Sequence, residues 1–286
     1  MDLSRFTWVE CPRDAMQGMT QFIPTGQKID YINQLIAVGF DVIDIGSFVS
    51  AKAIPQLQDS HEVINGVEWQ KKKPDFLVIV ANERGAENAC KEERVDTLGF
   101  PFSVSETFQL RNTSATQEDS LTRLDEIFKM AESTNKKLVI YLSMAFGNPY
   151  GDAYSADIVL EWCQQLSERY PKSIFSLSDT VGAAAPNQIE SLYLKSTEKF
   201  PHLTLGLHLH ATPQDAMMKA RSALNSGCLR IDSAMGGWGG CPMATNQLTG
   251  NLDSAVLKEL LYPNERYDWE AFLKAQIMAN SLFQNA

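Results

Sequence analysis

Short apolar segments alternate with longer amphipathic segments along nearly the whole chain. Eight of the apolar segments have the length and residue types of buried β-strands, and helical patterns separate them. Strands that alternate with helices in this way form parallel βαβ units. We expect strands at Thr7–Glu10, Val42–Ile45, Phe76–Val80, Thr97–Phe100, Leu138–Leu142, Ile174–Leu177, Leu203–His208 and Leu229–Ile231, and helices that include Thr25–Val38, Leu121–Ser133, Ser155–Tyr170, Pro186–Lys199 and Pro213–Ser226.

Eight such units predict an α/β fold, a single (β/α)8 TIM barrel over about residues 5–250. An open doubly wound sheet is the alternative, but no Gly-x-Gly-x-x-Gly follows the first strand. No linker or low-complexity break interrupts the chain, so one domain is expected over residues 1–286. Helical patterns at Ser254–Leu261 and Trp269–Phe283 predict extra C-terminal helices over about residues 251–286. The polar segment Ser103–Asp119 predicts an ordered loop or a short extra helix.

Charge and cysteine usage exclude several classes of function. A net charge of −10 argues against nucleic acid or an anionic membrane surface as the main partner. No apolar stretch approaches the ~18 residues of a transmembrane helix, and the first residues lack the pattern of a secretion signal. The five scattered cysteines have no zinc-finger or redox spacing, which is typical of a reducing cytoplasm.

Two histidines follow an apolar run at a spacing of two residues. In a β-strand, this spacing places the imidazoles of His208 and His210 on the same face, where they can hold one divalent metal. The alternative is an exposed edge strand, which the apolar neighbours Leu207 and Leu209 make less favourable. The pair therefore predicts a metal site at the end of the seventh strand.

Other polar residues follow the predicted strands, where barrels carry their reactive groups. Arg13 and Asp14 come after the first strand, and Asn251 comes after the eighth. The pair Arg13-Asp14 could also be an ordinary surface ion pair. One carboxylate, two imidazoles and an amide oxygen suit Mg²⁺ or Mn²⁺ better than structural zinc. Further polar positions at strand ends are Cys11, Asp44, Ser47 to Ser50, and Ser178 to Thr180.

One cysteine differs from the other four in its surroundings. Cys241 directly follows Gly236–Gly240, a segment with four glycines among five residues, which lets a backbone loop move and approach a ligand closely. An inert buried thiol is the alternative, and it is the interpretation we adopt for Cys90, Cys163 and Cys228. The role of Cys11 stays open.

From about Thr7 to about Asn251, the chain resembles the 3-hydroxy-3-methylglutaryl-CoA (HMG-CoA) lyases, a family of metal-dependent TIM-barrel enzymes. The similarity lies in several separate motifs. They are Val9-Glu-Cys-Pro-Arg-Asp14 with Gln17, Ser47-Phe-Val-Ser-Ala-Lys-Ala-Ile-Pro-Gln56, Ser105-Glu-Thr-Phe108, Ser178-Asp-Thr180, His208-Leu-His210, Gly237-Trp-Gly-Gly-Cys-Pro242 and Thr249-Gly-Asn251.

The resemblance implies cleavage of HMG-CoA to acetoacetate and acetyl-CoA with Mg²⁺ or Mn²⁺, in a homodimer. The first residues lack the Arg and Ser enrichment of a transit peptide, which favours the bacterial cytoplasm. Arg13 would stabilise the enolate of the thioester, and Cys241 would protonate the product carbanion. The base would be His208 or a nearby carboxylate. The implied metal ligands are Asp14, His208, His210 and Asn251; the further catalytic candidates are Asp44 and Asp179; the substrate-binding candidates are Arg13, Gln17, Ser47, Gly239 and Gly240; and Lys52 and Arg111 are candidates for the CoA nucleotide.

Three substitutions depart from the family pattern. Asp44 stands where a longer Glu is usual, which retracts the carboxylate by ~1.5 Å. Ala211 replaces an Asp, and Ala255 replaces a Glu. The segment between Cys241 and Asn251 is also one residue longer than in the animal enzymes. These departures leave a related 3-hydroxyacyl-CoA lyase, an aldolase or citramalate- or isopropylmalate-type synthase, and a non-catalytic acyl-CoA-binding protein as alternatives, among which Cys241 favours the lyase.

Overall fold

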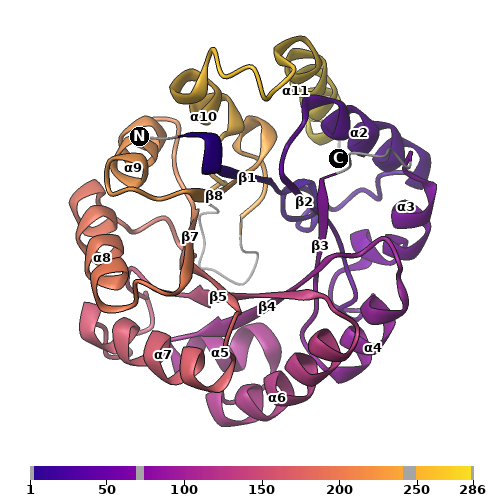
Figure 1. Cartoon of the computed structure of the whole chain (residues 1–286). Coiled ribbons are helices and arrows are strands. Elements are labelled where there is room, and N and C mark those ends of the chain that lie inside the picture. Colours follow the sequence, from indigo (N-terminus) through magenta and orange to yellow (C-terminus); the bar gives the residue numbers. More distant parts are fainter. Residues whose placement is uncertain (1–2, 69–73, 241–248, 285–286) are drawn as a thin grey trace.

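The eight predicted strands form a closed parallel barrel, in which each strand pairs with its neighbours in chain order (Figure 1). A computed structural model describes residues 3–68, 74–240 and 249–284. The predicted barrel is thus confirmed. The strands are β1 (Thr7–Glu10), β2 (Val42–Ser47), β3 (Asp75–Ile79), β4 (Thr97–Ser103), β5 (Lys137–Ser143), β6 (Ile174–Asp179), β7 (Thr204–Leu209) and β8 (Arg230–Ser233).

The helices lie around the barrel, and most of them cover the outer face of its sheet (Figure 1). They are α1 (Pro12–Met16), α2 (Thr25–Val38), α3 (Ser60–Gly66), α4 (Glu83–Lys91), α5 (Glu106–Thr113), α6 (Gln117–Ser133), α7 (Ala156–Arg169), α8 (Pro186–Lys199), α9 (Ala216–Asn225), α10 (Ser254–Leu261) and α11 (Trp269–Phe283). Short 3₁₀ turns are η1 (Leu3–Arg5), η2 (Pro55–Leu57) and η3 (Met235–Gly237). No helix in the described ranges is long and apolar enough to cross a membrane.

The polar segment after β4 contains the short extra helix that was one of its two predicted forms. The side chain of Ser105 caps α5 by accepting a hydrogen bond from Phe108 N. The next helix, α6, begins four residues earlier than its apolar pattern predicts, because Thr116 and Asp119 form a capping box at its first turn. Capping groups, rather than hydrophobic periodicity, therefore set both helix starts.

Strand β4 extends beyond Pro101, although proline predicts the end of a central strand. Val80 N donates to Gly99 O, so alternate residues of β4 direct their backbone groups toward β3. Pro101 faces the same side, but β3 already ends at Ile79. The missing N–H of Pro101 therefore removes no hydrogen bond from the sheet, and the strand continues to Ser103 beside β5.

The C-terminal helices pack on the outside of the barrel, against the side chain of Trp8 on β1. The ring of Trp8 lies 4.9 Å from that of Phe40 and 5.0 Å from that of Tyr267, both in edge-to-face contacts. Its Nε1 donates to Ser233 Oγ on β8. Helix α11 lies beside α2 (Figure 1), where Phe283 meets Tyr31. These aromatic contacts hold α11 against the barrel wall.

Candidate active site

The turn after β1 brings two charged side chains into the barrel mouth. Pro12 occupies the first position of α1, where its fixed φ favours a helix and its missing N–H breaks no hydrogen bond. The helix directs Arg13 and Asp14 inward, and both are buried. Such burial is costly for charged groups unless they are paired.

Arg13 is held on three sides by acceptors. Its Nε and Nη2 donate to Asp44 Oδ2 at 2.9 and 2.6 Å. Its Nη1 donates to Asp14 Oδ1 at 2.9 Å and to Gln17 Oε1 at 2.8 Å. Gln17 in turn donates to Asp14 Oδ1 at 2.6 Å. The shorter carboxylate of Asp44 therefore still reaches the guanidinium, and the network fixes where Arg13 points.

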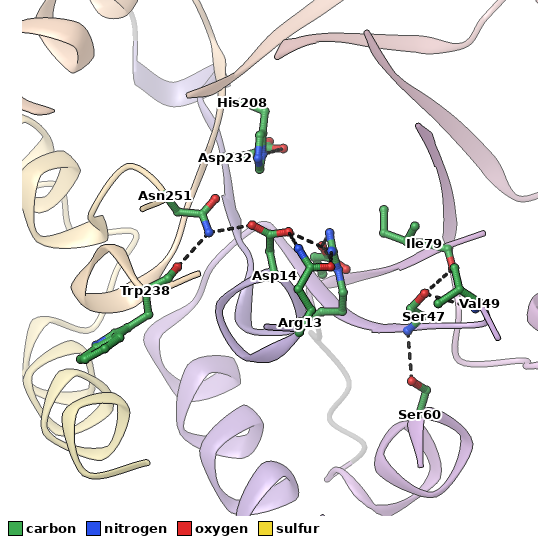
Figure 2. Close-up of polar contacts among 12 residues, drawn as sticks. Arg13, Asp14, Ser47, Val49, Ser60, Ile79, His208, Asp232, Trp238 and Asn251 are labelled. Carbon is green, nitrogen blue, oxygen red and sulfur yellow. Dashed lines mark hydrogen bonds and ion pairs between the residues drawn. The ribbon is translucent and has the colours of Figure 1, made fainter. Parts of the chain in front are cut away.

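The predicted metal ligands lie together at the same end of the barrel. Ligand atoms of Asp14, His208 and His210 all lie within 4.8 Å of one another, and the two Nε2 atoms are 3.2 Å apart. Asn251 donates its Nδ2 to Asp14 Oδ2 at 2.7 Å and to Trp238 O at 2.8 Å (Figure 2). These two bonds assign the amide nitrogen and leave Oδ1 as a further oxygen donor. A carboxylate, two imidazoles and an amide oxygen fit a divalent ion.

Electrostatics favours the metal-binding forms of Asp14 and His210, whereas the carboxylates of Asp232 and Asp14 raise the pKa of His208 despite its burial. Burial opposes the charge of Asp14, but Arg13 and the two histidines hold its pKa below the ordinary value, so it is an anion. Burial and the neighbouring His208 lower the pKa of His210 to about 3, so His210 is neutral and has a lone pair available. Burial raises the pKa of Asp44 to about 6, against the opposing effect of Arg13.

A cavity of about 730 Å³ opens above these groups. Its polar floor includes Arg13, Asp14, Asp44 and the two histidines, and its volume is within the range of small-molecule sites. The wall is largely apolar. The wall includes Phe22, Ile54, Ile79, Pro101, Phe108 and Tyr141.

Two of the predicted site residues point elsewhere. Ser47 donates its Oγ to Ile79 O and accepts from Val49 N, so it fastens the loop after β2 and does not line the cavity (Figure 2). Asp179 accepts hydrogen bonds from Ala184 N and from Lys219 Nζ, on the side away from the cavity. Its neighbours Ser178 and Thr180 line the cavity instead, as the alternation of a strand requires.

Lys219 was missed by the sequence analysis because it lies on a helix and not at a strand end. Its side chain is 1% exposed, and its Nζ donates to Asp179 Oδ2, Gly182 O and His210 O at 2.8–2.9 Å. It thus holds the backbone of a predicted metal ligand from behind. Ala211 takes no part in this contact, since it donates only its backbone N–H, to Gly250 O.

Asp232 was missed as well. Its Oδ2 lies 3.2 Å from His208 Nδ1, directly beside the ring (Figure 2). A carboxylate in this position orients a metal-binding imidazole so that its other nitrogen faces the ion. The alternation of charged and apolar residues in Arg230-Ile231-Asp232 was the available signal for two inward-facing charges on β8.

The glycine-rich segment reaches the site through a close backbone approach. Gly239 has φ +93°, and a Cβ at this position would lie 2.4 Å from Asp14 O and 2.8 Å from Asn251 Nδ2. Only glycine fits there without displacing the site. Gly239 and Gly240, which were predicted to bind substrate, are not among the residues that line the cavity. Cys241 lies outside the described residues.

A buried glutamate contacts the chain on both sides of the stretch that begins with the glycine-rich segment. Glu10 accepts from Met235 N at 2.8 Å and from Ser254 Oγ at 2.5 Å, so one carboxyl group joins η3 to the start of α10. Ala255 lies in the first turn of α10 and donates its N–H to Asp253 Oδ1. Burial raises the pKa of Glu10 to about 8.

Glu10 is expected to make folding stability fall as the pH rises. The folded state retains a proton that the unfolded state loses near pH 4.5, so the free energy of unfolding decreases between pH 4.5 and about 8. Glu10→Gln should remove this slope and should be relatively more stable at the upper end. Denaturant unfolding across this range measures the difference, with Glu190→Gln on the exposed face of α8 as the control. Parallel profiles for wild type and Glu10→Gln would contradict the assignment.

Comparison with known proteins places this chain in a family. The profile described as HMGL-like matches residues 5–276, which is most of the chain. The chain belongs to the HMGL-like family. This HMGL-like chain is 34% identical over 268 residues to the hydroxymethylglutaryl-CoA lyase YngG of Bacillus subtilis (strain 168), covering 93% of this chain and 86% of that one. The predicted family is therefore confirmed.

Solved structures agree with this assignment of the HMGL-like chain. The HMG-CoA lyase of Bacillus subtilis superposes with a TM-score of 0.89 at 32% identity, over 98% of this chain and 94% of that one. An HMG-CoA lyase of Acinetobacter baumannii, solved in complex with coenzyme A and 3-methylmalate, gives a TM-score of 0.90 at 28% identity, over 99% and 93%. Lyases of this family depend on a metal, and the HMGL-like chain has a possible metal-binding site.

Proposed function

We propose that the HMGL-like chain cleaves HMG-CoA to acetoacetate and acetyl-CoA and depends on Mg²⁺ or Mn²⁺. One observation carries the proposal: the donors of Asp14, His208 and His210 share the floor of one cavity with the guanidinium of Arg13. This arrangement places metal ligands beside a cation that can stabilise a developing oxyanion. Named relatives with the same fold support the choice of substrate.

Asp14, His208, His210 and Asn251 would hold the ion. When bound, it would polarise the oxygens of the substrate and orient them. Asn251 contributes in a second way, since its Nδ2 bridges Asp14 to Trp238 O and so joins the ligand set to the glycine-rich segment. The proposed site is therefore connected to the backbone that carries Cys241.

We assign the role of base to Asp44 and not to His208. In His208, Nε2 faces His210 and Nδ1 faces Asp232, so neither nitrogen is available to a substrate hydroxyl. Asp44 gives one oxygen, Oδ2, to Arg13, and its Oδ1 has no hydrogen-bond partner within the described residues. Asp44 also lines the cavity, and we assign its buried Oδ1 as the acceptor of the C3 hydroxyl proton once substrate occupies the cavity.

Loss of that proton leads to cleavage of the bond between C3 and C2. The electrons of the O–H bond form the ketone of acetoacetate, and those of the C–C bond pass to the thioester as an enolate. Arg13, fixed by Asp44 and Asp14, stabilises the enolate oxygen. The Cys241 thiol donates its proton to carbon to complete acetyl-CoA, and the proton held by Asp44 then passes to the Cys241 thiolate, which restores both groups.

The test is turnover of HMG-CoA by the metal-free protein after addition of Mg²⁺ or Mn²⁺. We expect acetoacetate and acetyl-CoA in equal amounts, and neither product when a chelator is present. Parallel reactions contain HMG-CoA analogues with other groups at C3, or acetyl-CoA with pyruvate or 2-oxoisovalerate. Faster cleavage of an analogue would identify a related acyl-CoA as the substrate. Condensation without cleavage would show that the protein is a synthase. No product from any reaction at high protein concentration would refute the lyase.

A further inference from the structure

A second set of metal-ligating atoms lies behind the first. Ligand atoms of Cys11, His208 and Asp232 all lie within 4.8 Å of one another. They come from adjoining strands, because β1 pairs with β8 and Cys11 N donates to Ser233 O, while His208 lies opposite Asp232 in the pairing of β7 with β8. Cys11 and Asp232 are fully buried, and the side chain of His208 is 14% exposed.

This set has unused hydrogen-bonding capacity. Asp232 shares Oδ2 with His208, but its Oδ1 has no partner among the described residues, and neither has the hydroxyl of Tyr141. The ring of Tyr141 stands edge-on to His208 at 5.8 Å. Burial, followed by the charges of Asp232 and Cys11, raises the pKa of the Tyr141 phenol well above its ordinary value. Buried oxygens without partners are rare and costly, and they favour a bound cation or water.

We propose that Cys11, His208 and Asp232 form a second metal site, which selects thiophilic divalent ions such as Zn²⁺ or Cd²⁺. A sulfur, an imidazole nitrogen and a carboxylate oxygen are the donors of a tetrahedral site with one open position. The set proposed for Mg²⁺ or Mn²⁺ has no sulfur among its ligands. The two sets therefore differ in the kind of ion they prefer, although they share His208.

The local charge favours a cation. Burial raises the pKa of the Cys11 thiol well above the ordinary value, and the negative charges of Asp232, Asp44 and Asp14 act in the same direction. The guanidinium of Arg13 opposes them, but it is already paired with Asp44 and Asp14. Arg230 lies two residues from Asp232 along β8, with its side chain against Gly206. Binding would replace the thiol proton, which leaves as the sulfur–metal bond forms.

The shared histidine connects this site to catalysis. An ion bound by Cys11 and Asp232 would also bind Nδ1 of His208 and draw the ring away from His210. The Nε2 atoms of the two histidines are 3.2 Å apart. A thiophilic ion should therefore inhibit even when Mg²⁺ is saturating. This inhibitory consequence rests on the proposed function, whereas binding to Cys11 does not.

The test titrates the metal-free full-length protein with Cd²⁺ and follows the ultraviolet thiolate-to-cadmium charge-transfer band. We expect one equivalent of Cd²⁺ to produce the band in wild type and in Cys241→Ser. Cys11→Ala should abolish it, and Asp232→Asn should weaken binding by ~10-fold or more. Cys228→Ala is the matched control, because it removes another fully buried barrel thiol and should retain the band.

Mn²⁺ binding separates the two sites in the same samples. Electron paramagnetic resonance should show normal Mn²⁺ affinity in Cys11→Ala, which also demonstrates that this variant folds, and the Cd²⁺ band should persist in Asp14→Asn. No band in wild type, or a band that survives in Cys11→Ala and disappears in Cys241→Ser, would overturn the proposal. A band that requires Cys11 in a protein without lyase activity would support the second site and refute the proposed function alone.

Discussion

Asp14→Asn is expected to lower kcat for HMG-CoA by ~10³-fold or more and to weaken Mn²⁺ binding by at least ~100-fold. Asp14 is the only carboxylate in the proposed ligand set of described residues, and Arg13 keeps it ionised. An amide has the same shape but no charge, so the ion loses its main electrostatic attraction. The same change leaves Arg13 paired with Asp44, which should preserve the fold.

Two measurements decide this prediction. Acetoacetate production gives kcat, and Mn²⁺ titration followed by electron paramagnetic resonance gives the affinity. Asp30→Asn on the exposed face of α2 is the control for loss of one negative charge and should match wild type in both. Normal Mn²⁺ affinity in Asp14→Asn, with an intact thermal unfolding transition, would remove Asp14 from the ligand set.

Arg13→Lys is expected to lower kcat by ~10²- to 10³-fold while Mn²⁺ affinity changes by less than tenfold. The guanidinium pairs with Asp44 through two nitrogens and still presents Nη1 to Asp14 and Gln17. A lysine ammonium has one nitrogen and cannot make both contacts while facing an enolate. The charge is retained, so the loss measures geometry.

Arg13→Met completes the experiment by removing the charge at similar length. It should be at least as slow as Arg13→Lys, and guanidinium ion added to the solution should restore part of kcat. Steady-state kinetics with and without guanidinium provide both values. A wild-type kcat in Arg13→Lys would show that the oxyanion is stabilised by another group.

The alternation of apolar and amphipathic segments was enough to predict the barrel, because hydrophobic periodicity is a local property of the chain. Element ends were harder to predict. The capping box at Thr116 decided where α6 begins. Strand β4 could continue past Pro101 because β3, its neighbour on that side, has already ended. Capping and strand pairing depend on which side chains and strands lie next to an element, and hydrophobic periodicity carries no information about these neighbours.

The site was predictable to the extent that it follows from strand ends. The carboxyl ends of parallel barrel strands meet at one face, and this rule alone brings Asp14 and the two histidines together. It does not say which way a terminal residue turns. Ser47 and Asp179 stand at strand ends like the others, yet one fastens a loop and the other pairs with Lys219.

By itself, the sequence determined the kind of fold, the family and the ends of the strands where donors gather. Only the tertiary structure decided that Asp232 lies behind His208, that Lys219 holds the carbonyl of His210, and that Cys11 joins a second donor set. The reason is that these contacts join strands and helices far apart in the chain, through side chains whose directions packing alone selects. Distances of a few ångströms between donors, which decide metal chemistry, exist only after the barrel has closed.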